Sequence, residues 1–268
     1  MPAGSSASPR VRRNRLIAAV TGMVLVAAAV VWAIVAFTPS SGSASPTAAP
    51  APSSSPTATP RPAPTATSTP TPVETFDMTA HSIDDPDSIW VVVDKLRPLD
   101  PVDHEPSDLV VVPVPHTWEP LMRAEAADAV VKMFRAASDE AGLALASNSA
   151  YRSYEAQERV YDNDDELTAR PGYSEHQTGL TIDIGPESGH CSLAVCFADT
   201  PEGQWLRDNA YRFGFLLRYP ADKVEVTGYQ FEPWHFRYIG TDLSNEMRET
   251  GVTTLEEFFG LPAAPNYA

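Results

Sequence analysis

The chain has 268 residues, long enough for one or two globular domains, and its formal net charge is −16 at pH 7. Its first 37 residues hold four arginines and no acidic residue, so the remainder carries a charge of about −20. Proteins that bind nucleic acids usually present a basic surface, so we expect no nucleic-acid partner.

Residues 16–37, "LIAAVTGMVLVAAAVVWAIVAF", contain no charged residue and are long enough to cross a hydrocarbon layer of about 30 Å as a helix. The arginines that precede them predict a cytoplasmic basic segment over residues 1–15 and export of everything that follows. A cleaved signal peptide is the alternative, but its apolar region normally spans only about 7–15 residues. We therefore expect a single-pass anchor in the cell membrane, with the following chain on the extracellular, cell-wall side.

Residues 38–75 consist almost entirely of proline, serine, threonine and alanine. Such a composition buries too little apolar surface to offset chain entropy, so we expect a disordered linker with an extended, stalk-like geometry. Glycosylation of its serines and threonines is left open. Residues 76–268 remain, which is a suitable length for one extracellular domain.

Two short β-branched runs open this domain, at residues 87–99 and 107–115, and both predict strands or extended edge segments because proline ends them. Apolar residues at helical spacing then predict a helix over residues 119–142. Thr117 is its expected N-cap and Gly142 its expected stop.

Caps mark two later helices. Ser153 is the expected N-cap of a helix predicted over residues 153–162. Thr200, as N-cap, and Pro201 begin another helix, which ends at Gly214. A last short helix is predicted near "TLEEFFG". The further strands are predicted at residues 143–153, 180–185, 214–220, 223–229 and 231–239. The fold class is therefore α+β, with helices packed on a central, largely antiparallel sheet.

Cys191 and Cys196 are the only cysteines, and both lie in the exported part. A disulfide between them is expected in an oxidising compartment. A zinc-binding cysteine pair is the alternative, but no second pair stands nearby to complete a four-ligand site.

Residues 180–185, "LTIDIG", alternate like a strand, which directs Leu180, Ile182 and Ile184 to one face and Asp183 to the more polar face. His176 precedes this strand through a predicted turn. A carboxylate at this position of a sheet, close after a histidine, indicates a chemical site.

A second polar cluster, "FEPWHFRY", supplies Glu232 and His235. His176, Asp183 and His235 suit a catalytic zinc, which takes three protein ligands and leaves one position for water. Glu232 would then be the general base. In a regular strand Glu232 and His235 would lie on opposite faces, so their convergence requires a bend, which we place at Pro233.

Three segments, "SAYRSYEAQ", "SEHQTGLTID" and "EPWHFRY", resemble in order the signature segments of VanY-type D-alanyl-D-alanine carboxypeptidases. That family belongs to a wider group of zinc peptidases that includes lysostaphin-like enzymes and the hedgehog N-terminal domain. "WLRDNAYRFGFLLRYP" is also similar to the family's helix and strand between the last two segments. The resemblance spans roughly residues 88–240 and implies the fold of that zinc peptidase group.

The resemblance implies that His176, Asp183 and His235 bind zinc. It also implies that Glu232 takes a proton from the attacking water and passes it to the leaving amine. Both implications agree with the roles proposed above from the residues themselves.

The same resemblance implies that Arg152 stabilises the oxyanion or holds a substrate carboxylate, which its planar guanidinium suits. Gln157 and Ser174 match positions expected to line the substrate site. Thr181 departs from the family, which usually has alanine there, but removes no ligand.

The sequence thus predicts a membrane-anchored zinc carboxypeptidase that removes the C-terminal D-alanine from peptidoglycan stem peptides. An L,D-carboxypeptidase and a cross-link endopeptidase are alternatives on the same site. A non-catalytic wall-binding module with a structural zinc is another, but the presence of Glu232 argues against it. A membrane sensor is disfavoured because the cytoplasmic segment is too short for a signalling domain.

Overall fold

The computed structural model describes residues 75–268. The segments expected to be cytoplasmic (1–15), membrane-spanning (16–37) and, apart from Thr75, stalk-like (38–75) lie outside the described residues. Among the helices of the described part, none combines the length and apolar character that crossing a membrane requires.

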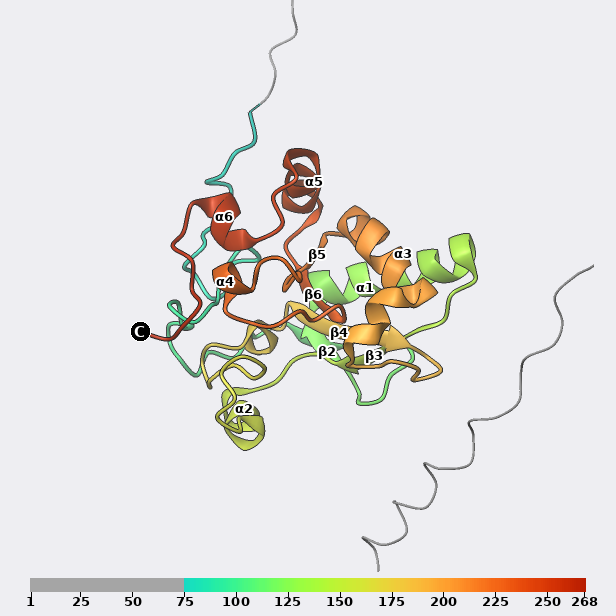
Figure 1. The fold of residues 1–268 in the computed structure, drawn as a ribbon, viewed down its shortest axis with the longest axis horizontal. Coiled ribbons are helices and arrows are strands. Elements are labelled where there is room, and N and C mark those ends of the chain that lie inside the picture. Colours follow the sequence, from blue (N-terminus) through green and yellow to red (C-terminus); the bar gives the residue numbers. More distant parts are fainter. Residues whose placement is uncertain (1–74) are drawn as a thin grey trace, which may run out of the picture. The chain divides into compact units, whose positions relative to one another are not determined.

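A four-stranded antiparallel sheet organises the described chain, with strand order β3-β4-β6-β5 (Figure 1). Its strands are β3 (Leu145–Ser149), β4 (Thr181–Pro186), β6 (His235–Tyr238) and β5 (Phe215–Leu217). A separate antiparallel ribbon pairs β1 (Leu109–Val111) with β2 (Leu121–Arg123). The predicted α+β class with a largely antiparallel sheet is confirmed.

Helices surround the sheet, and Figure 1 shows α4 and α6 close to the C-terminus with α1 and α3 on the other side of the view. The α-helices are α1 (Ala124–Ala141), α2 (Tyr154–Val160), α3 (Pro201–Asn209), α4 (Val224–Thr227), α5 (Thr241–Thr250) and α6 (Leu255–Phe259). Three 3-10 helices are η1 (Glu175–Thr178), η2 (Val195–Asp199) and η3 (Ala210–Phe213).

The main core lies between α1 and the sheet. Val130, Met133 and Ala137 of α1 are fully buried in one cluster with Ile182 and Ile184 of β4. Burying an aliphatic side chain of this size stabilises the fold by about 1.5–3 kcal/mol. The apolar face of β4 is thereby fixed against α1, which leaves its other face for the polar residues.

Residues 87–99, predicted as a strand or an extended edge segment, form no strand in the described chain, although their apolar alternation is real. Val91 packs in the main core, whereas Trp90 and Val92 pack in a second core formed with α5 and α6. The segment pairs with no named strand, because arginine side chains occupy its carbonyl groups: Arg237 donates to the Val91 carbonyl at 2.8 Å. In the described chain its one β-bridge joins Asp94 to Arg97 across the turn at residues 95 and 96.

Other boundaries also differ from the predictions. The helix expected over 119–142 begins only at Ala124, since the residues before it pair with β1, and Thr117 therefore does not cap it. Gly142 ends it as expected, in the left-handed conformation with φ 66°. The strand predicted over 223–229 is the short helix α4, and α5 was not predicted at all.

Two of the three predicted N-caps, Ser153 and Thr200, are confirmed. The Ser153 hydroxyl accepts a hydrogen bond from the Ala156 amide at the start of α2. Thr200 accepts one from the Gly203 amide at the start of α3, and Gly214 ends the following 3-10 turn. These positions follow from local chemistry, because each cap bonds an amide that has no partner inside the helix.

Candidate active site

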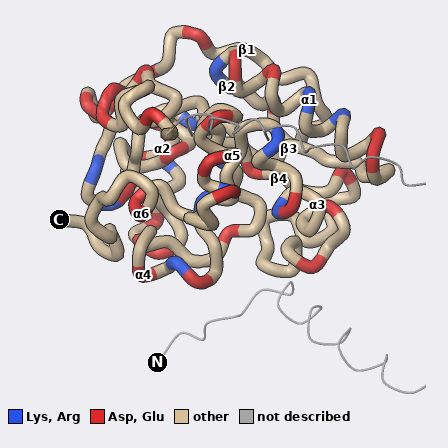
Figure 2. The backbone as a smooth tube through the Cα atoms, turned by 90° about the horizontal axis from the view of Figure 1, so that it is seen from above, with Lys and Arg blue, Asp and Glu red and all other residues tan. Residues whose placement is uncertain are grey.

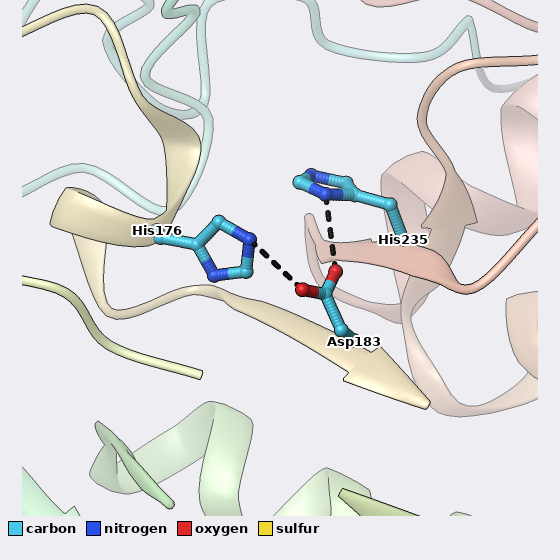
Figure 3. Close-up of side chains that lie close together, drawn as sticks. All are labelled: His176, Asp183 and His235. Atoms are coloured by element: carbon cyan, nitrogen blue, oxygen red, sulfur yellow. Dashed lines mark ion pairs between the residues drawn. The ribbon is translucent and has the colours of Figure 1, made fainter. Parts of the chain in front are cut away.

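Three elements bring His176, Asp183 and His235 together (Figure 3). Asp183 of β4 stands directly opposite His235 of β6 in the antiparallel register, and His176 comes from η1 just before β4. Asp183 Oδ2 lies 3.3 Å from His176 Nε2, and Asp183 Oδ1 lies 3.3 Å from His235 Nδ1. All three residues are at most 5% exposed.

The turn that delivers His176 depends on Gly179. This glycine ends η1 with φ 67°, and a Cβ there would stand 2.8 Å from a methyl group of Leu109. Its amide donates to the His176 carbonyl, while its own carbonyl accepts from the Arg123 amide. A larger residue would suffer both backbone strain and a clash, so glycine sets the path from η1 into β4.

Each histidine is oriented by a hydrogen bond at the ring nitrogen that faces away from Asp183. His176 Nδ1 donates to the Ala150 carbonyl at 2.7 Å, which leaves a free lone pair on Nε2. His235 Nε2 donates to Glu175 Oε2 at 3.3 Å, so Nδ1 is the nitrogen that carries the lone pair once the ring is neutral. Metal-binding histidines are commonly fixed in this manner by an acceptor behind the ring.

The three residues fit a zinc ion. Zinc–ligand bonds of about 2.0–2.2 Å in a tetrahedron place two ligand atoms about 3.4 Å apart. Each histidine nitrogen lies 3.3 Å from Asp183, but from a different carboxylate oxygen. The three ligand atoms all lie within 4.8 Å of one another. Asp183 Oδ1 is buried and, within residues 75–268, has no hydrogen-bond partner. This oxygen is therefore free to bind a metal ion.

The ligand set has the electrostatics of a metal site. Burial raises the pKa of Asp183, but His176 and His235 more than offset it, so its pKa lies well below the usual value and the group is ionised. Burial lowers the pKa of His176, which favours its neutral form. Burial also lowers the pKa of His235, but Asp183 and Glu175 raise it to about 9, so a metal must displace a proton there.

Glu232 reaches the site through a turn. The His235 amide donates to the Glu232 carbonyl at 3.1 Å, which bends the chain at Pro233 and Trp234. Glu232 Oε2 consequently lies 3.4 Å from His235 Nδ1 instead of on the opposite face. The bend expected at Pro233 is present.

The environment of Glu232 suits proton transfer. Burial raises its pKa, His235 lowers it, and Asp183 raises it, with a final value of about 7. A carboxyl group with that pKa can both take and return a proton near neutral pH.

Arg152 is held at the edge of the site. Its amide donates to the His176 carbonyl, and its guanidinium donates to Gln157 Oε1 at 3.0 Å and to Ser149 Oγ at 3.3 Å. Burial lowers its pKa, while Asp183 and Glu232 raise it. A guanidinium remains charged in such surroundings, so Arg152 supplies a fixed cation.

A cleft of about 520 Å³ is lined by the three predicted zinc ligands together with Glu232 and Arg152. Ser174 and Gln157 line it as expected, but Gln157 is fully buried and both ends of its amide are engaged, with Arg152 and with the Ala169 carbonyl. Gln157 therefore positions Arg152 and the neighbouring loop. Thr181 is also fully buried, and its hydroxyl has no hydrogen-bond partner within the described chain.

One wall of the cleft is the loop 191–196, which the disulfide between Cys191 and Cys196 closes. Leu193 and Val195 in this loop line the cleft while remaining 50% and 57% exposed. The cleft thus has a polar floor and an apolar rim.

The sequence interpretation missed Glu175. This residue is fully buried between Arg218 and Arg237, whose nitrogen atoms lie 2.8 and 2.9 Å from its Oε1, and its Oε2 holds His235. Burial raises its pKa, but the two arginines more than offset this, so the pKa lies well below the usual value. The available signal was a carboxylate beside His176 and an arginine, Arg237, at an inward position of a strand.

Comparison with known proteins identifies the family. Residues 119–241 match the family "VanY: D-alanyl-D-alanine carboxypeptidase". The protein YodJ of Bacillus subtilis (strain 168) is 42% identical over 192 residues, covering 66% of this chain and 69% of that protein. The chain belongs to the VanY family. The resemblance inferred from the three signature segments is confirmed.

Solved structures of VanY-like proteins share the fold. The LdcB LD-carboxypeptidase is 42% identical, with a TM-score of 0.61 over 65% of this chain and 87% of that one. The vancomycin-resistance D,D-pentapeptidase VanY, solved with Zn(II), is 28% identical, with a TM-score of 0.53 over 63% of this chain and 97% of that one. The VanY-like fold and the donor set described above agree with each other.

Proposed function

We propose that the protein is a zinc-dependent carboxypeptidase that removes the C-terminal D-alanine from peptidoglycan stem peptides. The observation that carries this proposal is the convergence of His176, Asp183 and His235 with Glu232 placed 3.4 Å from His235. A zinc ion held by the three ligands would polarise the scissile carbonyl and acidify a water molecule. The zinc-complexed VanY relative supports this assignment.

Glu232 carries the proton in the proposed reaction. Its carboxylate takes a proton from the water as the oxygen attacks the amide carbon, and returns that proton to the nitrogen of the leaving D-alanine when the carbon–nitrogen bond breaks. One water is consumed, and a shortened peptide and free D-alanine are the products. Burial keeps the pKa of Glu232 at about 7, so neither transfer is strongly uphill.

Arg152 provides the positive charge that the reaction requires. A guanidinium has five N–H donors, and Gln157 and Ser149 take one each, so others are available for an oxyanion or a terminal carboxylate. Figure 2 shows acidic positions spread over the described chain, so the surface as a whole does not attract an anionic peptide. The attraction is local to the cleft.

Two specificities compete within this proposal. The sequence favoured D,D-cleavage of a pentapeptide, which is the type of activity named for VanY. The greater identity to LdcB, an LD-carboxypeptidase, favours L,D-cleavage of a tetrapeptide. Both reactions release D-alanine with the same residues.

The test uses the full-length protein in detergent, with a synthetic stem pentapeptide ending in D-Ala-D-Ala and a tetrapeptide ending in one D-Ala. We expect D-alanine release that a zinc chelator abolishes and added zinc restores, with products resolved by mass spectrometry. Release from the pentapeptide alone indicates D,D-specificity, and release from the tetrapeptide alone indicates L,D-specificity. Absence of release from both peptides by the folded, zinc-loaded protein would refute the carboxypeptidase proposal.

We also propose that residues 16–37 anchor the enzyme in the cell membrane with the catalytic domain on the cell-wall side. The uncharged apolar run and the preceding arginines support this proposal. In fractionated cells, the protein is expected to resist extraction from membranes by alkaline carbonate, whereas a variant lacking residues 1–37 is expected in the soluble fraction after cytoplasmic expression. Full extraction of the intact protein by carbonate would contradict the anchor.

A further inference from the structure

Tyr267, in the C-terminal segment 261–268, contacts residues that neighbour or line the cleft. The Tyr267 hydroxyl accepts a hydrogen bond from the Arg170 amide at 2.9 Å, and the Arg170 guanidinium lies 4.0 Å from the centre of the tyrosine ring. The edge of Tyr173 lies against the same ring, with 5.0 Å between ring centres. Tyr267 thus contacts a neighbouring loop at both the backbone and the side chain of Arg170, and it packs against Tyr173, the residue that follows the loop.

That loop, residues 162–172, forms a wall of the catalytic cleft. Leu167, Thr168 and Ala169 line the cleft. Other hydrogen bonds also tie the loop to the fold. In its middle, the Ala169 carbonyl accepts from Gln157, and the Glu166 carbonyl accepts from the Gln230 amide. At its end, the Gly172 carbonyl accepts from the Leu99 amide, and the Gly172 amide donates to Gln177 Oε1.

Within the loop, Arg170 pairs with Asp165 through two hydrogen bonds, of 2.6 and 3.1 Å. This pair braces the loop internally, and Asp165 also accepts a hydrogen bond from the Tyr161 hydroxyl at the end of α2. Tyr267 adds a hydrogen bond to the Arg170 amide and a stacking contact with the Arg170 guanidinium, so it contributes to the position of the loop over the cleft.

Tyr267 also contacts a second wall of the cleft. Its hydroxyl lies 3.1 Å from the hydroxyl of Tyr229, which lines the cleft and packs against Tyr219 with 4.8 Å between ring centres. Tyr267 therefore spans two cleft walls that are otherwise far apart in the sequence.

A buried lysine fixes the segment that carries Tyr267. Lys95 is 2% exposed, and its ammonium group donates to the carbonyls of Gly228 and Pro265. It also lies 4.8 Å from the ring centre of Tyr229 and 5.6 Å from that of Tyr267. A buried charge needs such compensation, so the cation and the segment hold each other in place.

We propose that Tyr267 is a positioning residue for the substrate cleft: it holds the loop 162–172 in the substrate-binding arrangement. The expected change in KM rests on the proposed function, whereas the expected ordering of the loop does not. If a substrate binds only when the loop is ordered, its apparent Kd equals the intrinsic Kd divided by the fraction of molecules in which the loop is ordered. The metal ligands and Glu232 lie on β4, β6, η1 and the turn before β6, outside the loop, so we expect loss of Tyr267 to affect substrate binding more than the chemical step.

The experiment compares Tyr267→Ala and Tyr267→Phe in the full-length, zinc-loaded protein. Tyr211→Ala is the matched control, because Tyr211 also stacks under an arginine, Arg248, with 5.1 Å from guanidinium to ring centre, but lies outside the cleft. Steady-state D-alanine release gives kcat and KM, hydrogen exchange followed by mass spectrometry reports on residues 162–172, and thermal unfolding monitors the whole domain.

For Tyr267→Ala we expect KM to rise about tenfold with kcat within about twofold of the parent, as for a loop ordered in one molecule in ten. Exchange is expected to accelerate about tenfold or more in residues 162–172 and to stay unchanged in the sheet. Tyr267→Phe keeps the stacking on Arg170 but loses the bond to its amide, so exchange should increase at that amide, with a smaller rise in KM. Tyr211→Ala is expected to leave KM and loop exchange unchanged.

Unchanged loop exchange in Tyr267→Ala would overturn the proposal, whether or not the protein releases D-alanine. Exchange that accelerates throughout the domain, with a large fall in the unfolding temperature, would also overturn it and assign Tyr267 to general stability. If no peptide is cleaved by the parent protein, the proposed function fails, and the exchange result alone decides whether Tyr267 orders the loop.

Discussion

Replacement of Glu232 by glutamine is expected to lower kcat for D-alanine release by about a thousandfold, within the range of 10²–10⁴ found for general acid–base groups. Glutamine preserves the shape of the side chain but cannot take or return the proton. Zinc content is expected to stay at the parent level, since the ligands are His176, Asp183 and His235. Kinetics and metal analysis on the same preparation separate the two effects.

The same variant gives a pH signature in the metal-free protein. Burial raises the pKa of Glu232 to about 7, so ionising it destabilises the folded state above the ordinary carboxyl pKa, and fully so above pH 7. Glu232→Gln lacks this penalty and is expected to unfold at a higher temperature than the parent at pH 8. The difference should vanish near pH 4, where the parent carboxyl is protonated in both the folded and the unfolded state.

Glu225→Gln is the matched control, because this glutamate is exposed on α4 and away from the cleft. It is expected to leave kcat, zinc content and the pH dependence of unfolding unchanged. A Glu232→Gln protein whose kcat stays within about tenfold of the parent would contradict the assignment of Glu232 as the proton-transfer group.

Replacement of Glu175 by glutamine is expected to destabilise the domain by about 3–5 kcal/mol, because removing one partner of a buried charge network leaves the other charges uncompensated. Arg218 retains Glu256, at 2.6 Å, but within the described residues Arg237 loses its only carboxylate. In a domain of this size such a loss lowers the unfolding temperature by roughly 10 °C.

Glu175→Gln is also expected to weaken zinc binding by about 10–100-fold, the usual effect of altering the group that orients a ligand histidine. The ligand concerned is His235, whose Nε2 donates to Glu175 at 3.3 Å. Competition with a coloured zinc chelator measures the affinity. Loss of stability without any change in zinc affinity would contradict the orienting role.

Glu140→Gln is the control for this second variant. Glu140 pairs with Arg212 through two hydrogen bonds of 2.7 and 2.8 Å, but its side chain is 42% exposed. An exposed ion pair of this kind contributes little to stability, so the unfolding temperature is expected to stay close to that of the parent. The contrast between two arginine-paired glutamates isolates the effect of burial.

Local chemistry allowed much of the structure to be predicted. The caps at Ser153 and Thr200, the stop at Gly142 and the alternation around Asp183 all follow from hydrogen bonding and side-chain periodicity within a few residues. The pattern of two histidines, an aspartate and a glutamate with a proline beside it indicated the zinc chemistry before any contact was known.

The failures occur where a distant part of the chain decides the outcome. Residues 87–99 have strand periodicity but divide between two cores, and Arg237, far along the chain, takes the place of a neighbouring strand. Residues 223–229 also alternate, yet they form α4, which ends at Gly228 in the left-handed conformation. The distant Ala264 packs there, and its amide donates to the Val226 carbonyl.

The sequence by itself determined the α+β class, the caps of α2 and α3, the family and the identity of the four residues that form the proposed centre. Only the tertiary structure decided that Glu175, two arginines and His235 form one buried network, and that Tyr267 joins two walls of the cleft. The physical reason is the range of the interactions. Periodicity and capping act over a few residues, whereas charge compensation and loop positioning depend on groups that folding brings together from dozens of residues apart.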